Sequence, residues 1–377
     1  MKIAIFGGSF NPVHNEHVNI VRAAVKALNL DKVIILPSFI TPKKDGRLTA
    51  TAQQRLEMCR LAFNEVDRAE VSGYEITRGG VSYSYITCEE FAKKYPADER
   101  YFILGADMLD DFLNWKNPER ILSAVKLAVC ARVDGEGLRT SLKNFEARFK
   151  TKPVSFNYVG KDVSSTRLRT LLALGEEPAG LNAEVYGYIK RNNIYAIPRL
   201  AEVKNLLTEK RWKHTVGVCL MAAQNCRRVG ASEEQAITAA ALHDCAKYLT
   251  AESPLLKGFK CPDGVPGQVV HQYASAYVAG REFKVTDKDI INSIKYHTSG
   301  RAGMSGLEKL IYLCDMLEDG RDFDGVEALR AVFAKDIDEC LLAALKHQIN
   351  YLNNSGEKIY PLTLETYEYL KGTKNDQ

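Results

Sequence analysis

Two histidines near the start of the chain stand where a strand pattern changes into a helix pattern. The segment reads Gly7-Gly8-Ser9-Phe10-Asn11-Pro12-Val13-His14-Asn15-Glu16-His17. A glycine-rich turn before a helix exposes backbone N–H groups to an anion, and His14 and His17, one helical turn apart, can both face it. The segment therefore predicts a phosphate-binding site, against the simpler alternative of a glycine turn with incidental histidines.

A second segment that could bind anions is Val163-Ser164-Ser165-Thr166-Arg167-Leu168-Arg169, where another helix is expected to begin. Serine and threonine are also common helix N-caps, so capping alone is the alternative explanation. Hydroxyl groups and two arginines at a helix start suit a polyphosphate. The presence of His14 and His17 in the same chain favours the phosphate interpretation.

Six histidine and aspartate residues in the second half lie within otherwise apolar helical patterns: His214, His243, Asp244, His271, His297 and Asp315. A lone histidine in such a pattern is usually a satisfied core residue. Buried imidazole and carboxylate groups without partners would destabilise the fold, however, and metal coordination removes that penalty. The donor types suit Fe, Mn, Zn or Ni, and their order suits two ions bridged by Asp244.

The elements that must position these residues divide the chain into two parts. Buried-strand patterns alternate with helical patterns in the first part, at residues 2–6, 32–36, 101–104, 127–133 and 154–159. This alternation predicts an α/β, Rossmann-like fold with a parallel sheet, whose ligands bind at the carboxyl ends of the strands. The pattern from residue 201 onward is almost entirely helical and predicts an all-α domain. We expect the two domains to be residues 1–197 and 198–377.

The composition fits two globular domains: 377 residues, 46% hydrophobic and 26% charged. A net charge of +4 argues against a protein that wraps nucleic acid. The sequence has no apolar run near the roughly 20 residues of a membrane span. The nine cysteines form no CxxC pair and follow no leader pattern. We therefore expect a cytoplasmic protein that binds neither nucleic acid nor membrane and is compatible with a homo-oligomer.

The first part resembles the bacterial nicotinate mononucleotide adenylyltransferases of the nucleotidylyltransferase superfamily. The resemblance rests on the GGSFNPVHNEH segment, which is similar to the (H/T)xGH signature, and on GADML, Trp115, VSSTRLR and the RGGVSYS segment from Arg78. It implies transfer of the adenylyl group from ATP to nicotinate mononucleotide, giving deamido-NAD and pyrophosphate, with Mg²⁺ accompanying ATP.

The same resemblance implies roles for individual residues. His14, His17 and Arg169 would hold the ATP phosphates, and Ser165 and Thr166 would assist them. Lys44 would lie near the phosphates and Asp107 near the nucleotide ribose, while Trp115 would stack on the pyridine ring and Ser84 would approach its carboxylate. The remaining substrate contacts would come from strand-end residues: Gly7, Gly8, Ser9, Phe10 and Gly105.

Four positions depart from the family pattern. Asn11, Glu16, Lys43 and Ser84 stand where Asp, Gly, His and Thr are usual. Glu16 adds a carboxylate near bound phosphate, and we expect it to point outward. The alternative is a transferase for another acceptor, such as nicotinamide mononucleotide or phosphopantetheine, but Trp115 and residues 82–84 favour nicotinate.

The second part resembles the HD-domain hydrolases, and more narrowly the YqeK family, over about residues 200–370. The resemblance rests on RWKHTVGV, ALHDCAK, VVHQYASA, IKYHTSGR and LIYLCDMLEDGR. It implies metal-dependent, symmetrical hydrolysis of diadenosine tetraphosphate to two ADP. The alternative is that this half binds a nucleotide as a regulator of the transferase.

The HD-domain resemblance also assigns ligands to two metal ions, with iron as the expected metal. One ion would be held by His214, His243, Asp244 and Asp315, and the other by Asp244, His271 and His297. The candidate phosphate contacts are Lys247, Arg301 and Arg321.

Overall fold

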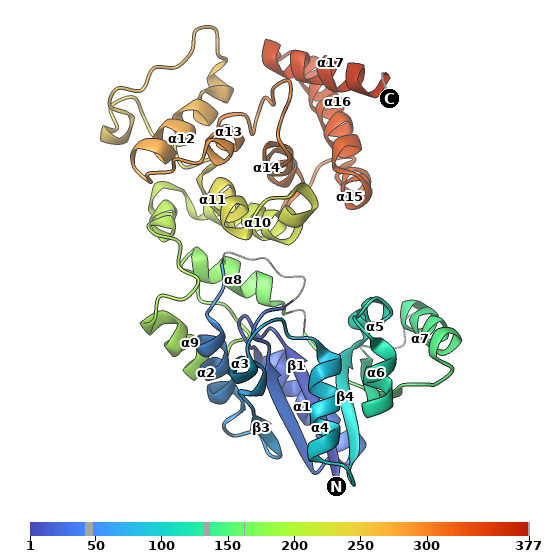
Figure 1. Ribbon diagram of the computed structural model, residues 1–377. Helices are drawn as coiled ribbons and strands as arrows, with labels where there is room; N and C mark the ends of the chain where they lie inside the picture. Colours follow the sequence, from blue (N-terminus) through green and yellow to red (C-terminus); the bar gives the residue numbers. More distant parts are fainter. Residues whose placement is uncertain (42–47, 132–135, 162, 376–377) are drawn as a thin grey trace. The chain divides into compact units, whose positions relative to one another are not determined.

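The computed structural model describes residues 1–41, 48–131, 136–161 and 163–375. Contacts between residues divide the chain into two compact units (Figure 1). The first comprises Met1–Asp45, Thr49–Leu168 and Pro178–Tyr195, and the second is made mainly of Arg169–Glu177 and Ala196–Gln377.

A six-stranded parallel sheet forms the centre of the first unit, with the strand order β3-β2-β1-β4-β5-β6. The strands are β1 (Lys2–Gly8), β2 (Lys32–Pro37), β3 (Ala69–Val71), β4 (Glu99–Gly105), β5 (Lys126–Ala131) and β6 (Val154–Asn157). The strand order reverses between β1 and β4, and such a reversal opens a crevice at the carboxyl ends of the strands. The predicted phosphate segment begins at the end of β1, and Gly105 is the last residue of the adjacent strand β4.

The prediction of a Rossmann-like parallel sheet is confirmed, with small differences in its strands. The three-residue strand β3 was missed because so short a segment shows no periodicity. Strand β6 ends at Asn157, two residues before the apolar pattern does, and the last two residues expected in β5, 132 and 133, lie outside the described residues.

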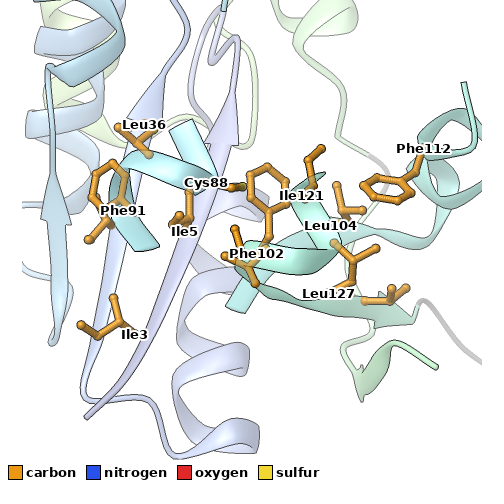
Figure 2. Packing of buried hydrophobic residues seen from close by; sticks show 14 of the residues in the cluster. Ile3, Ile5, Leu36, Cys88, Phe91, Phe102, Leu104, Phe112, Ile121 and Leu127 are labelled. Carbon is orange, nitrogen blue, oxygen red and sulfur yellow. The ribbon is translucent and has the colours of Figure 1, made fainter. Parts of the chain in front are cut away.

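The helices of the first unit connect the strands and cover the sheet. They are α1 (Asn15–Leu28), α2 (Ala52–Phe63), α3 (Tyr74–Arg78), α4 (Ser84–Lys94), α5 (Leu109–Phe112), α6 (Pro118–Ala124), α7 (Glu136–Phe149), α8 (Ser165–Ala173) and α9 (Ala183–Arg191). Side chains two residues apart on a strand point to the same face, so Ile3 and Ile5 both face α4 and pack with its Phe91 (Figure 2). Phe102 and Leu104 extend this core toward α5. Each large apolar side chain buried there contributes about 1.5–3 kcal/mol, which holds the strand ends in place.

The described residues of the second unit form helices joined by loops, with no strand among them. This unit contains the 3₁₀ segment Leu200–Leu206 and α10 (Glu209–Asn225), α11 (Glu233–Leu242), α12 (Val270–Arg281), α13 (Lys288–Lys295), α14 (Gly306–Leu317), α15 (Val326–Lys335), α16 (Ile337–Ser355) and α17 (Pro361–Asn375). The all-α prediction is confirmed. The helix expected from residue 201 is interrupted, because the Thr208 hydroxyl accepts the Arg211 N–H and starts α10 there. The side chains of Ser232 and Asp287 cap α11 and α13.

Across the described ranges, no helix is both long enough and apolar enough to cross a membrane.

Candidate active sites

The two histidines of the first segment stack at the N-terminus of α1. His14 is the N-cap residue, and its backbone N–H donates to Nδ1 of His17 over 3.1 Å. The centroids of the two imidazole rings lie 3.7 Å apart. Because Nδ1 of His17 accepts a hydrogen bond, the neutral ring carries its proton on Nε2. His17 is thus oriented as a hydrogen-bond donor at a helix N-terminus, which is the chemistry a phosphate needs.

A buried arginine holds the loop between β1 and α1 in place. Arg55 on α2 donates to the carbonyl oxygens of Ser9 (2.7 Å) and Phe39 (2.9 Å), and burial lowers its pKa. The side-chain oxygen of Asn11 accepts the Ala50 N–H (3.0 Å) and the Tyr195 hydroxyl (2.7 Å). Arg55 was not among the predicted site residues, although its helical register with the apolar Met58 and Cys59 was a signal that could have found it.

Packing explains two of the glycine-loop residues. A Cβ on Gly8 would lie 3.2 Å from the ring of Phe10, which is closer than ordinary contact. Phe10 itself is buried and has a φ of 46°, so its ring folds back over Gly8. The close approach of the chain to Gly8 therefore needs a residue without a side chain.

The second predicted phosphate segment begins α8, and its hydroxyls bond within the protein. Ser164 accepts the Arg167 N–H (3.2 Å) as a helix cap, and Ser165 donates to the carbonyl of Pro12 (3.0 Å). Thr166 lies in the first turn of α8. Ser165 thus ties the start of α8 to the loop that carries His14.

Arg169 forms a buried ion pair in this structure. Its Nε donates to Oε2 of Glu233 over 2.8 Å, and both side chains are less than 10% exposed. Both residues belong to the second compact unit. The sequence analysis did not foresee this carboxylate partner, and contact between Arg169 and phosphate stays a prediction.

Two residues expected to bind the acceptor, Ser84 and Trp115, lie within the described part of the chain. Ser84 is the first residue of α4, where the N-cap Tyr83 makes no side-chain capping bond. Trp115 is half-buried, and its ring packs edge-on against Phe102 and at a tilt against Phe112. Lys43 and Lys44 lie outside the described residues, and so does the side chain of Asp107.

The expectation that Glu16 points outward is wrong. Its side chain is 3% exposed and faces the segment after β6. Oε2 accepts the Tyr158 hydroxyl and the Lys161 N–H, each over 2.9 Å, and Oε1 accepts from Asn19 over 3.3 Å. Three donors compensate the lost hydration of the carboxylate, so burial is favourable. Glu16 therefore joins the helix of His14 and His17 to the segment that leads to α8.

This connection explains Gly160 and gives a prediction about stability. A Cβ on Gly160 would lie 2.4 Å from Oε2 of Glu16 and 3.0 Å from the ring of Tyr158. We expect Gly160→Ala to lower the free energy of unfolding by about 1–3 kcal/mol, because the carboxylate must leave its donors. In a Glu16→Ala background, the same substitution should cost clearly less. Urea denaturation of the four proteins checks this, and losses that simply add would contradict it.

The six predicted ligands of the second half come together in one cluster, called here the histidine–aspartate cluster. Its members lie on or directly after five helices: His214 on α10, His243 and Asp244 after α11, His271 on α12, His297 after α13 and Asp315 on α14. Nε2 of His214 lies 2.9 Å from Oδ1 of Asp315, and Nε2 of His271 lies 3.1 Å from Nε2 of His297. Two subsets have ligand atoms close enough for one ion each: His214, His243 and Asp315, and His243, Asp244 and His297.

The carboxylate of Asp244 lies at the centre of the cluster. Its Oδ1 is 3.3 Å from Nε2 of His271 and 3.5 Å from Nε2 of His297, while Oδ2 is 3.4 Å from Nε2 of His243. Nε2 of His243 is fully buried and has no hydrogen-bond partner among the described residues. A buried polar atom without a partner is costly, and a metal ion would satisfy it. The donor set therefore fits divalent metal ions.

The charges of the cluster influence one another strongly. Burial lowers the pKa of His243, but the carboxylates of Asp244 and Asp315 outweigh it and raise this pKa to about 10. Burial, together with His297 and Lys247, lowers the pKa of His271 to about 3. Burial alone would raise the pKa of Asp244, yet the neighbouring imidazoles hold it well below the usual range. Metal ligation requires His243 to give up its proton.

Cationic side chains border the cluster, including one that the sequence analysis missed. Arg211, one turn before His214, lies 2.9 Å from Oδ2 of Asp244. Lys247 lies 3.3 Å from Oδ1 of the same carboxylate, and Arg321 donates to Oδ1 of Asp315 over 2.6 Å. The third predicted phosphate contact, Arg301, instead donates to the buried carboxylate of Glu308.

Comparison with known proteins agrees with both halves of the structure. Residues 5–171 match the cytidylyltransferase-like family, and residues 211–340 match the HD domain. The fold and the two sites therefore define a nucleotidyltransferase domain followed by an HD domain.

Curated relatives identify the family more narrowly. A Mycoplasma pneumoniae protein named "Probable nicotinate-nucleotide adenylyltransferase/Ap4A hydrolase" is 30% identical over 84% of this chain and 88% of its own length. A Clostridium tetani "Probable nicotinate-nucleotide adenylyltransferase" is 38% identical, over 52% of this chain and 98% of the relative. The Bacillus subtilis "Bis(5'-nucleosyl)-tetraphosphatase, symmetrical" is 37% identical, over 45% of this chain and 95% of the relative. The chain belongs to the family of two-domain nicotinate-nucleotide adenylyltransferase/Ap4A hydrolases, which confirms both resemblances.

Proposed function

We propose that this chain is a bifunctional enzyme. Its first half transfers the adenylyl group of ATP to nicotinate mononucleotide, and its second half hydrolyses diadenosine tetraphosphate symmetrically to two ADP. The pairing of His14 with His17 at the N-terminus of α1 supports the transferase, and the convergence of His243, His271 and His297 on Asp244 supports the hydrolase.

The transferase needs positioning and charge stabilisation rather than a covalent intermediate. The phosphate of the mononucleotide would attack the α-phosphorus of ATP and displace pyrophosphate, and Mg²⁺ bound with ATP would screen the phosphate charge. Charge that develops on the phosphate oxygens would be met by His14, by the Nε2–H of His17 and by the positive end of the α1 helix dipole. Ser165 keeps α8 close to this loop through Pro12.

The nicotinate carboxylate would bind near Ser84 and the first N–H groups of α4. Tyr83, before Ser84, makes no side-chain capping bond, so these donors suit an anion. Trp115 would present the face of its ring to the pyridine. Its edge-on packing on Phe102 fixes the orientation of that ring.

Acceptor choice tests the nicotinate assignment. A carboxylate accepts from every donor at this helix start, whereas the amide of nicotinamide mononucleotide brings a donor of its own. We expect kcat/KM to favour nicotinate mononucleotide by about ten- to a hundredfold or more. Paired kinetics with both mononucleotides measure it. Equal values, or a preference for the amide, would overturn the acceptor and leave a nucleotidyltransferase of other specificity.

For the hydrolase, we propose two divalent ions in the histidine–aspartate cluster, with iron favoured over Mn, Zn or Ni. His214, His243, Asp244 and Asp315 would hold one ion, and Asp244, His271 and His297 the other. Such ions supply Lewis acidity and an activated water as nucleophile. Arg321 and Lys247 would bind the polyphosphate beside them. A nucleotide-binding regulator is the alternative, but a complete set of six ligands favours catalysis.

A further inference from the structure

Glu318 contacts the histidine–aspartate cluster from outside the predicted ligand set. Its Oε1 lies 3.0 Å from Nδ1 of His214, while Nε2 on the other side of that ring lies 2.9 Å from Asp315. The Glu318 side chain is 4% exposed, and its Oε2 accepts the Gly320 N–H over 2.7 Å. The carboxylate is therefore buried and held at both oxygens.

Two other histidines of the cluster use a different acceptor. Nδ1 of His243 lies 2.6 Å from the carbonyl of Ala240, and Nδ1 of His297 lies 2.8 Å from the carbonyl of Ile294. A carbonyl from the preceding helical turn fixes these rings. His214 has a charged carboxylate in that place, which makes the imidazole a stronger ligand as well as orienting it.

A glycine on α10 leaves room for the carboxylate of Glu318. Gly217 follows His214 by three residues, so both lie on the same side of the helix. A Cβ on Gly217 would lie 2.3 Å from Oε2 of Glu318 and 3.5 Å from its Cβ. The glycine thus leaves the volume that the carboxylate group occupies.

We propose that Glu318 is a positioning residue of the HD-domain site. It accepts the proton of Nδ1 of His214 and thereby directs the lone pair of Nε2 toward the ion held with His243 and Asp315. The proposal rests on the proposed function of the cluster as a metal site. The sequence places Glu318 three residues after Asp315, so one end of α14 supplies both a ligand and the support for another ligand.

The test measures metal affinity rather than activity. Mn²⁺ binding to the metal-free full-length protein is followed by electron paramagnetic resonance of the free ion. Glu318→Ala should weaken binding by about 10- to 100-fold, the usual effect of removing such a partner. Glu318→Gln keeps the size of the side chain and should weaken binding less, so it tests the proposal even if the alanine variant unfolds.

A substitution at Gly217 is a second, independent way to remove the contact between Glu318 and His214. Gly217→Ala should displace the carboxylate and weaken Mn²⁺ binding about as much as Glu318→Ala. In the double variant the two losses should not add, because the contact is already gone. The matched control is Glu308→Gln, since Glu308 is another buried carboxylate of α14 that pairs with Arg301 instead of a ligand. It should lower stability yet leave Mn²⁺ affinity unchanged within about twofold.

The outcomes distinguish failure of the role proposed for Glu318 from failure of the proposed metal site. Wild-type affinity in folded Glu318→Gln and Gly217→Ala would overturn the role of Glu318 while leaving a metal site. An equal loss in Glu308→Gln would also overturn it, because the effect would then be general destabilisation. If the wild type bound no Mn²⁺, the metal site itself would be overturned. The same would follow if Asp244→Ala bound Mn²⁺ as tightly as the wild type.

Discussion

Asp244→Ala is expected to remove bound metal and to abolish formation of ADP from diadenosine tetraphosphate together. Asp244 offers one oxygen to His271 and His297 and the other to His243, so its loss removes a ligand that we propose for both ions. Metal ions contribute several kcal/mol to such a reaction, so the rate should fall by at least about a thousandfold. Metal analysis and chromatography of the nucleotide products measure the two effects on one sample.

The control for this variant is Asp319→Ala, which removes an exposed aspartate that follows α14, the helix of the cluster residue Asp315. It should leave metal content and hydrolysis unchanged. If Asp244→Ala kept its metal and still produced ADP, the two-ion assignment would fail.

His17→Ala should lower kcat of adenylyl transfer by about a hundredfold or more while the protein stays folded. The substitution removes a donor whose orientation is set by the bond from the His14 backbone to Nδ1. Loss of one such donor costs about 3 kcal/mol in the transition state. Steady-state kinetics for ATP and the acceptor, with circular dichroism for the fold, check the effect.

His347→Ala is the matched control for His17→Ala. His347 lies on α16, where its ring packs against Phe323 at a centroid distance of 5.0 Å. Its removal should not alter adenylyl transfer. A wild-type rate in His17→Ala would show that the loop before α1 is not the phosphate site.

Local patterns in the sequence were sufficient for the sheet and for both groups of histidines. His14 and His17 are three residues apart at a helix start, so helical geometry alone brings their rings together. The six cluster residues stand within apolar helical patterns, which predicts that they face inward. Helices that share one core then bring inward-facing ligands together, as at His214 and Asp315.

The contacts that the sequence analysis missed all join distant parts of the chain. Glu16 bonds to Tyr158, 142 residues away, and His214 to Glu318, 104 residues away. At Glu16 the helical pattern permits both a solvated and a buried carboxylate, and only the position of the segment after β6 decides between them. Arg169 was predicted from local chemistry to meet phosphate, but a local pattern carries no information about Glu233.

The roles of two glycines also could not be predicted from local sequence patterns. Gly160 and Gly217 look like ordinary flexible or small residues in the sequence. In the structure each leaves room for the carboxylate of a residue far along the chain, Glu16 or Glu318. Such pairs can be recognised only in the folded structure, from the short distance between a Cβ placed on the glycine and the neighbouring carboxylate.

The central claim is that one chain carries two separate active sites. The most direct measurement assays both reactions in wild type, His17→Ala and Asp244→Ala, each as the full-length protein. We predict that His17→Ala loses transfer but forms ADP from diadenosine tetraphosphate at the wild-type rate, and that Asp244→Ala shows the reverse. Loss of both activities in either folded variant, or of neither activity in both, would contradict the claim.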